Sequence, residues 1–361
     1  MKHLFFILKI QHMSTKEYPL IPLFEKFIQY SYKGKRLKAD GSRIKSQTIG
    51  NYAYVLRYLK EFEAAQGIVL RIRPVNNNNK RLLTAEKNYW KKFYLQFTNY
   101  LYHQKDCYDN YVGSVIKVIR MFFNFINREL SIVTGNFYQS FYVSREEVPI
   151  VTLMPQQLQF LISNHAFDET LTKSLKKTKD IFVFGSTVAL RVSDLFAIRF
   201  SDVENVGGAF YLPVTSVKTG TAVRIKLPAY AMDIIQRFKA TAKGRKTIFP
   251  PIPLSRFNKQ LKLIVEKAGW TNHIGRQRMR RGIAVKETGN RKTQRFCDLV
   301  SSHTMRRTAI TTMLMLGMKE HVVKKISGHS DNSKSFYRYV NLVQSYLDNE
   351  MDELFNKLAV A

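Results

Sequence analysis

The sequence contains very little cysteine, with only Cys107 and Cys297 in 361 residues. Two distant cysteines cannot build a disulfide framework or a cysteine-rich zinc site, and they are typical of a reducing compartment. Long apolar runs are also lacking, since none approaches the roughly 20 residues that a membrane span needs. The short apolar run near the start is interrupted by Lys9 and is followed by no small-residue cleavage site, so a secretory signal peptide is not expected. These shortages together predict a soluble, cytoplasmic protein.

Acidic residues are scarce as well. The chain has 27 acidic and 58 basic residues, which gives a formal net charge of +31. Such an excess favours a polyanionic partner, whose condensed counterions would be released on binding. The charge alone does not separate DNA from RNA or from an anionic membrane. The 19 Tyr and 25 Phe argue against a disordered basic chain and indicate a sizeable core.

The N-terminal third shows apolar residues at helical spacing in four segments. We predict helices over residues 22–32, 46–62, 84–101 and 108–127, with Ser46 and Thr84 as N-caps. They form a helical module over residues 18–130, after an N-terminal segment 1–17 and before a linker 131–150. Basic residues of the first loop could follow a DNA backbone, or they could form an ordinary solvated face: Lys33, Lys35, Arg36, Lys38, Arg43 and Lys45.

A second domain is expected over residues 151–361. Pro155 suits the first turn of a short helix, and further helices are expected over residues 169–189, 230–243, 254–268, 304–316 and 319–326. Strands 209–214 and 222–227 would form a hairpin with Lys218 near its tip. The basic segment 274–292 is either a DNA-facing connector or a solvated run of charge. The fold class is therefore mainly α with a small β-sheet (α+β).

The stretch 301–340 organises the chain, because it gathers groups that suit the breaking of a DNA phosphodiester by a tyrosine. It carries His303 and Arg306 as H-x-x-R, then Gly328-His329, then two tyrosines. With no metal, fixed cations must stabilise the negative charge of the transition state, and arginine forks fit phosphate well. Arg306 and the upstream Arg191 are the candidates for this clamp.

The remaining roles follow from proton transfer. A tyrosine phenol titrates near ~10 and needs a base or cation to act as a nucleophile at neutral pH. His303 is the expected proton acceptor. The leaving 5′-alkoxide needs a proton, which Lys218 could donate. His329 would donate a hydrogen bond to the phosphate or orient the nucleophile.

The order Arg191, Lys218, His303-x-x-Arg306, Gly328-His329, Tyr resembles the tyrosine recombinase (phage integrase) family. ALRVSDLFAIRFSDV looks like its first arginine box, and SHTMRRT with ISGH and FYRYV looks like its second. The resemblance covers residues 151–361 well and the rest loosely, where the S-x-T-x-x-x-Y-x-x-x-L pattern from Ser46 looks like the core-binding (SAM-like) domain. It implies that both arginines clamp the phosphate, Lys218 is the general acid, His303 the acid/base, and His329 the supporting donor.

The position of the nucleophile departs from the family pattern. The family tyrosine usually lies nine residues after the G-H histidine, where this chain has Arg338, while Tyr337 and Tyr339 lie eight and ten residues after it. We assign Tyr339, because S-F-x-[RK]-Y-[VI] resembles integrases of bacterial mobile elements, in which the preceding aromatic residue packs inward. Tyr337 remains the alternative.

The resemblance also implies partners and a reaction course. Double-stranded DNA would be bound by a homotetramer, with possible accessory DNA-bending proteins, and cleavage would give a 3′-phosphotyrosine without cofactor, metal or ATP. The amphipathic tail with Tyr346, Leu347, Leu354 and Phe355 would dock on a neighbouring protomer or pack on its own domain. Integration or excision of a mobile element is favoured, and the protein would act at the nucleoid. The alternatives are chromosome-dimer resolution, a type IB topoisomerase, and a DNA-binding relative without activity.

Overall fold

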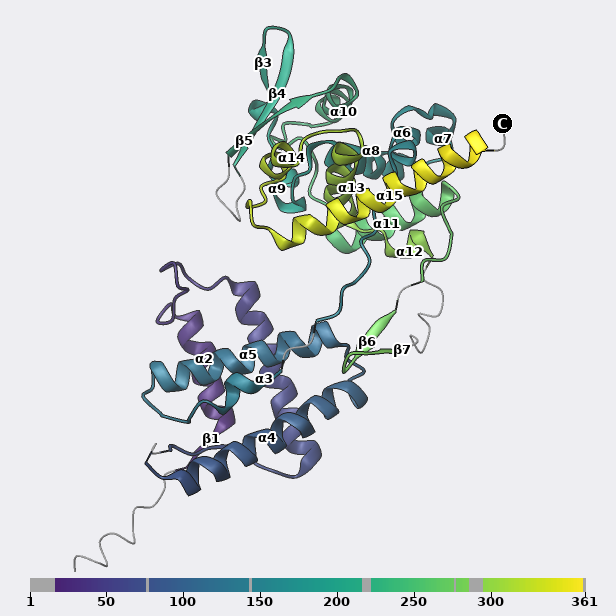
Figure 1. Cartoon of the computed structure of the whole chain (residues 1–361). Helices are drawn as coiled ribbons and strands as arrows, with labels where there is room; N and C mark the ends of the chain where they lie inside the picture. The colour runs from purple at the N-terminus through teal and green to yellow at the C-terminus, as the bar shows by residue number, and fades with distance from the viewer. Residues whose placement is uncertain are drawn as a thin grey trace, which may run out of the picture. The chain divides into compact units, whose positions relative to one another are not determined.

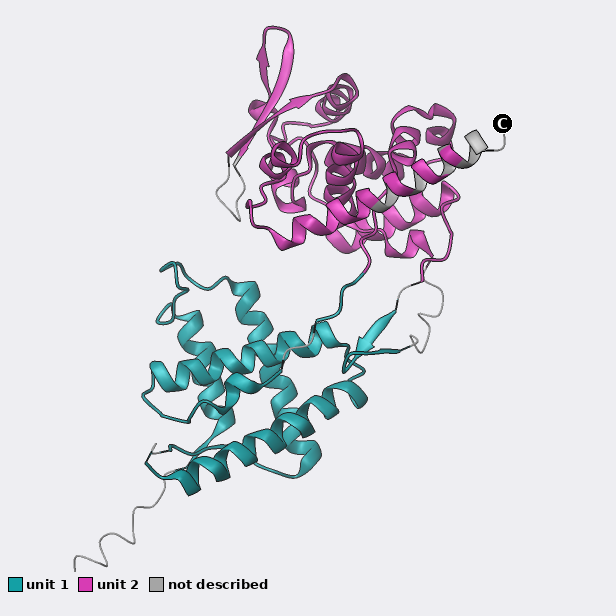
Figure 2. Ribbon diagram, viewed as in Figure 1, with its two compact units in different colours: residues 1–148, 277–287 teal, residues 149–276, 288–361 magenta. Residues whose placement is uncertain are grey.

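The computed structural model describes residues 17–75, 78–142, 145–215, 222–275, 277–285 and 295–359. The chain divides into two compact units, which Figure 2 colours separately. Unit 1 contains residues 1–148 and 277–287, and unit 2 contains residues 149–276 and 288–361. The segment 277–287 therefore belongs to unit 1, although it lies within the stretch 151–361 in which the sequence indicates one continuous domain.

Unit 1 is a helical module (Figure 1), and aromatic side chains make up much of its core. Its helices are α2 (Leu20–Tyr32), α3 (Ser46–Gln66), α4 (Lys80–His103) and α5 (Asp109–Arg128). Short strands β1 (Tyr18–Pro19) and β2 (Arg71–Ile72) pair antiparallel, and the 3-10 helix η1 (Phe137–Ser140) follows α5. The four helices predicted from apolar spacing are confirmed. Phe27, Phe62 and Phe122 are fully buried, so these aromatic stripes form core.

Both predicted N-caps in unit 1 are wrong. Helix α3 begins at Ser46 itself, after Lys45, and no side chain caps it. Helix α4 begins four residues before Thr84, where the side chain of Asn79 accepts a hydrogen bond from the backbone N–H of Leu82 at 3.0 Å. Thr84 instead donates from Oγ1 to the carbonyl of Lys80 inside the helix.

The basic segment at residues 278–285 forms the antiparallel hairpin of β6 (Arg278–Arg280) and β7 (Ile283–Val285). Its turn donates backbone hydrogen bonds to the buried carboxylate of Asp109, from Arg281 at 2.8 Å and from Gly282 at 2.9 Å. Arg278 pairs at 2.6 Å with Glu146, which is also buried. Carboxylates of unit 1 thus bind part of this segment, while residues 281–284 are exposed, and contact with DNA there stays a prediction.

Unit 2 is mainly helical and packs around one large apolar cluster. Its helices are α6 (Pro155–Ser163), α7 (His165–Glu169), α8 (Lys173–Val188), α9 (Val192–Ala197), η2 (Phe200–Asp202), α10 (Ala229–Ala240), α11 (Leu254–Lys267), α12 (Phe296–Leu299), α13 (Ser302–Met315), α14 (Glu320–Ser327) and α15 (Lys334–Ala359). Pro155 is the first residue of α6, as predicted. The helix expected over residues 169–189 is α8, which starts later, at Lys173, because Thr172 is its N-cap and accepts a hydrogen bond from the N–H of Leu175. The short helix α7 precedes it.

A three-stranded antiparallel sheet completes unit 2. Its order is β3 (Glu204–Val206), β4 (Ala209–Thr215) and β5 (Ala222–Leu227), with Leu212 opposite Ile225. The hairpin of β4 and β5 is confirmed, and β3 is an additional edge strand. Residues 216–221, which include Lys218, lie outside the described part of the chain. The fold is α+β, as the sequence indicates.

Candidate active site

Helix α13 carries Arg306 in its second turn and packs against α8, α14 and α15 (Figure 1). The guanidinium donates from Nη1 to the carbonyl of Ala189 at 2.8 Å, and from Nη2 to the carbonyl of Ser327. These bonds hold the planar fork between the end of α8 and the end of α14. Burial, together with the nearby charge of Arg191, lowers the pKa of Arg306 to about 10, so the side chain is still a cation at pH 7.

Arg191 enters the same site from the short turn between α8 and α9. Ala189 ends α8 in the left-handed region, with φ 55°, which redirects the chain before Arg191. Arg191 then forms the N-cap of α9, with its carbonyl accepting from the N–H of Leu195 at 2.8 Å. Its charge acts on both Arg306 and His329. The two boxes of the sequence therefore meet in one electropositive site.

His329 lies just after α14. Gly328 adopts φ 61° at the C-cap, and the N–H of His329 donates to the carbonyl of Lys324 at 2.9 Å. The ring nitrogen Nδ1 lies 2.8 Å from Ser327 Oγ and 3.5 Å from Arg306 Nη2. Burial lowers the pKa of His329 to about 4, with further lowering by the charges of Arg306 and Arg191. The imidazole is therefore neutral at pH 7 in the absence of a bound anion.

The two candidate tyrosines lie on different faces of α15. The Tyr339 ring lies 6.1 Å from the His329 ring between centroids and 6.2 Å from the Phe336 ring. Phe336 is fully buried beside both. Tyr337 is 49% exposed, with Lys324 Nζ 4.9 Å from its ring. The geometry thus places Tyr339, rather than Tyr337, with His329.

The other two predicted site residues are His303 and Lys218. His303 is the second residue of α13 and is exposed. It is therefore part of the first helical turn, whereas the sequence suggested that the helix follows it. Lys218 lies outside the described residues. Of the six assigned residues, the structure gathers Arg191, Arg306, His329 and Tyr339.

Two residues of this site were not singled out from the sequence. Asp194 in the first box is buried, and its charge opposes the lowering of the Arg306 pKa. Ser327, directly before Gly328, is also buried and contacts His329. Asp194 could have been identified from the sequence, because it is an acidic residue only three positions after Arg191. The contact between Ser327 and His329 could not have been identified in this way, because it depends on how the end of α14 is capped.

The predicted DNA-facing loop of unit 1 includes one residue with a structural role. The Arg36 guanidinium lies 4.4 Å from the Phe27 ring centroid and 3.6 Å from the carboxylate of Glu129. Its side chain is only 14% exposed. This cation therefore supports the fold of unit 1 and is a poorer candidate for phosphate contact than the exposed Lys33, Lys38 and Arg43.

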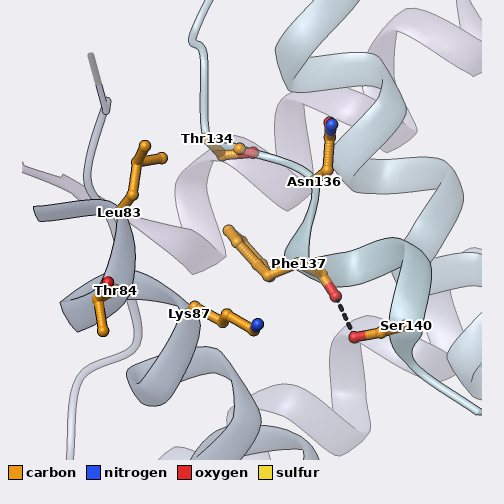
Figure 3. Close-up of a pocket in the computed structure, with 8 residues that line it drawn as sticks. Leu83, Thr84, Lys87, Thr134, Asn136, Phe137 and Ser140 are labelled. Carbon is orange, nitrogen blue, oxygen red and sulfur yellow. Dashed lines mark hydrogen bonds between the residues drawn. The ribbon is translucent and has the colours of Figure 1, made fainter. Parts of the chain in front are cut away.

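The described residues also contain cavities away from these groups. Figure 3 shows one of about 370 Å³ in unit 1, between α4 and the segment that leads into η1. Phe137 and Lys87 line it, and the Ser140 hydroxyl donates to the Phe137 carbonyl at 2.7 Å. None of the candidate catalytic residues lines it. In the described ranges no three His, Cys, Asp or Glu residues form a group suited to a metal ion, and no helix is long and apolar enough to cross a membrane.

The chain is similar to known proteins in its sequence and in its fold. Residues 164–345 match the model of the phage integrase family. A lambda integrase dimer bound to a COC′ core site is similar in structure, with a TM-score of 0.59, 13% identity, and coverage of 92% of this chain and 80% of that chain. No curated protein matches the sequence.

Two further solved structures are similar over nearly the whole chain. XerH site-specific recombinase bound to a palindromic difH substrate has a TM-score of 0.56 and 12% identity, over 92% of this chain and 95% of that chain. The Tn1549 transposon integrase in complex with transposon right end DNA has a TM-score of 0.55 and 16% identity, over 93% and 99%. At these identities the likeness establishes a shared fold.

Proposed function

This chain belongs to the phage integrase family, and we propose that it is a site-specific tyrosine recombinase that cuts and rejoins DNA through a 3′-phosphotyrosine. The observation that carries the proposal is the meeting of Arg191, Arg306, His329 and Tyr339 in one site of unit 2. The net charge of +31 supports a DNA partner. The similar structures with DNA are of a lambda integrase, XerH and the Tn1549 integrase.

The proposed cleavage begins with phosphate binding. Arg306 is held by two carbonyls in a fixed orientation, so its remaining N–H groups, with Arg191, would stabilise charge on the non-bridging oxygens without reorganisation. The Tyr339 oxygen attacks phosphorus, and its proton passes to His303. The bond from phosphorus to the 5′-oxygen breaks, and Lys218 protonates that oxygen. His329 supports the phosphate.

Rejoining is the reverse reaction with a different strand. The 5′-hydroxyl of the partner strand attacks the phosphotyrosine, Tyr339 leaves as the phenol, and the phosphodiester forms again. The ester conserves the bond energy, so the step uses no ATP. Repeating the exchange on the second strand pair would pass through a Holliday junction in a homotetramer. Integration or excision of a mobile element is the role that we propose, supported by the S-F-x-R-Y-V motif around Tyr339.

The C-terminal helix supports assembly of protomers. On α15, Leu347, Met351 and Phe355 recur every four residues and are 42%, 48% and 57% exposed. Residues at this spacing lie on one helical face, and a row of exposed large apolar side chains marks a surface for a partner. We assign that partner to a second copy of the chain on the DNA. The protein would act in the cytoplasm at the nucleoid.

The decisive test is a covalent adduct. The protein is incubated in EDTA with nicked DNA that spans the flanks of its own gene, and denaturing gels are used to detect protein joined to DNA. Wild type and Tyr337→Phe are expected to form the adduct, and Tyr339→Phe is expected to form none. An adduct lost only in Tyr337→Phe would move the nucleophile by two residues. No adduct with wild type on any nicked flank would favour a binding protein without cleavage activity.

A further inference from the structure

The side chain of Ser327 has two close polar neighbours. Its Oγ lies 2.6 Å from the carbonyl oxygen of Val323, one helical turn earlier, and 2.8 Å from Nδ1 of His329. Ser327 is only 2% exposed, so water does not compete for these contacts. Its backbone carbonyl accepts from Arg306. The residue therefore contacts both groups that face the proposed phosphate site.

The hydroxyl has a single proton, and the two neighbours differ in what they can supply. The Val323 carbonyl can only accept, so two oxygens at 2.6 Å require the hydroxyl proton between them. The contact with His329 must then be made by a proton on Nδ1, with Ser327 Oγ accepting. In a neutral imidazole the other nitrogen, Nε2, has an unshared pair and no proton.

We propose that Ser327 is a positioning residue that holds neutral His329 in the Nδ1–H tautomer, which leaves Nε2 as a proton acceptor. This refines the role of His329, and it rests on the proposed function for its catalytic meaning. In this tautomer His329 can take a proton at Nε2 from a reacting group. It can donate to a phosphate oxygen only after taking up that proton.

The electrostatic surroundings are consistent with this order of events. The charges of Arg306 and Arg191 disfavour the cationic form of the ring, while Phe336 and Tyr339 pack beside it. A phosphate placed between the arginines would neutralise part of their charge and raise the pKa of His329. Binding of DNA would thus make it easier for His329 to take up a proton and become a donor.

Removal of the Ser327 hydroxyl is expected to favour the opposite tautomer of His329. Without Ser327 Oγ, the polar group next nearest to Nδ1 is Arg306 Nη2 at 3.5 Å. A guanidinium only donates, so Nδ1 would then need its unshared pair, and the proton would move to Nε2. Ser327→Ala is therefore expected to exchange the tautomer rather than only loosen the ring.

The test is nuclear magnetic resonance of the free, full-length protein labelled with ¹⁵N-histidine at pH 7.5, because protonated and unprotonated ring nitrogens resonate in separate regions. The chain has eight histidines, and His329→Gln identifies the signals of His329. Wild type is expected to show a protonated Nδ1 and an unprotonated Nε2, and Ser327→Ala the reverse. A protonated Nε2 in wild type would overturn the proposal. An unchanged tautomer in Ser327→Ala would equally remove the role of Ser327.

The control is Ser163→Ala. Ser163 makes the same bond to a carbonyl one turn earlier, to Gln159 at 2.9 Å, but is exposed. It is expected to leave the His329 signals unchanged, and thermal unfolding shows whether Ser327→Ala still folds. The tautomer is measured without DNA. A result that contradicts the proposed tautomer therefore leaves the recombinase proposal intact. A missing adduct in the cleavage assay would likewise leave the tautomer result standing.

Discussion

Arg306 donates from Nη1 to the carbonyl oxygen of Ala189 at 2.8 Å, two residues before Arg191. The residue that ends α8 thus fixes one arginine and directs the other, although the two are far apart in the sequence. Its φ of 55° is a conformation that costs a non-glycine residue about 1 kcal/mol or more. The site depends on this turn as much as on the arginines themselves.

The substitution Arg306→Lys tests whether the site needs the several N–H donors of the Arg306 guanidinium. Lysine keeps the charge, but a single ammonium cannot span the carbonyls of Ala189 and Ser327 and also a phosphate. Adduct formation should fall by about a hundredfold or more, and the free energy of unfolding by about 1–3 kcal/mol. Gel assays and urea unfolding measure these effects. Arg307→Lys, one residue further along α13, is the matched control, and an equal loss in both variants would argue against a special role of the fork.

The low pKa of His329 predicts a pH dependence of stability. Between its ordinary 6.5 and about 4, the unfolded chain binds a proton that the folded protein does not. Stability is therefore expected to decrease as pH falls through this range, by up to about 3 kcal/mol from this group, and to change little from it below pH 4. Urea unfolding at pH 7, 6, 5 and 4 measures the loss.

His329→Gln should remove that part of the slope. His321→Gln, an exposed histidine on α14, is the control for the loss of a histidine in the same region. Parallel slopes in wild type and His329→Gln would show that the ring is not held neutral by its surroundings.

Asp109→Asn tests the attachment of the β6–β7 hairpin to unit 1. Asp109 accepts from the N–H groups of Arg281 and Gly282 and from the Tyr102 hydroxyl at 2.7 Å. An amide replaces one accepting oxygen by a donor, so a buried N–H would lose its partner at a cost of about 1–3 kcal/mol. Hydrogen exchange should become faster in residues 278–285.

Asp106→Asn is the matched control for the hairpin. Asp106 also pairs with the hairpin, through Arg280, but its side chain is 65% exposed. An exposed ion pair contributes roughly 0–1 kcal/mol, so exchange in the hairpin should change much less. The importance of the buried carboxylate would be refuted by equal effects of the two substitutions.

The exposed apolar residues Leu347, Met351 and Phe355 of α15 predict that assembly of protomers can be abolished without loss of DNA cleavage. Replacing Leu347 and Phe355 together by Gln leaves Phe336 and Tyr339 untouched at the start of the helix. Single protomers should still bind DNA and form the adduct, while larger complexes in gel shifts should be lost. Truncation after Asn341 should act in the same way, and unchanged assembly in both variants would mean that the tail packs on its own unit.

Local patterns in the sequence are enough to indicate the class of the protein. Apolar spacing located the main helices and the β4–β5 hairpin, and the order of Arg191, His303, Arg306 and Gly328-His329 indicated the family. These signals are local, because helical periodicity and short motifs are written in neighbouring residues. The net charge also needs no structure, since it is a sum over the chain.

Which side chains meet in the site depends on the packing of segments that are distant in the sequence. Successive residues of a helix differ by about 100°, so Tyr337 and Tyr339 face different ways, but only the packing of Phe336 shows which face meets His329. The attachment of residues 278–282 to Asp109 and Glu146 joins positions more than a hundred residues apart. Ser327 gains its contact only because Gly328 turns the chain back. Such long-range contacts and caps depend on how elements pack, which no local pattern contains.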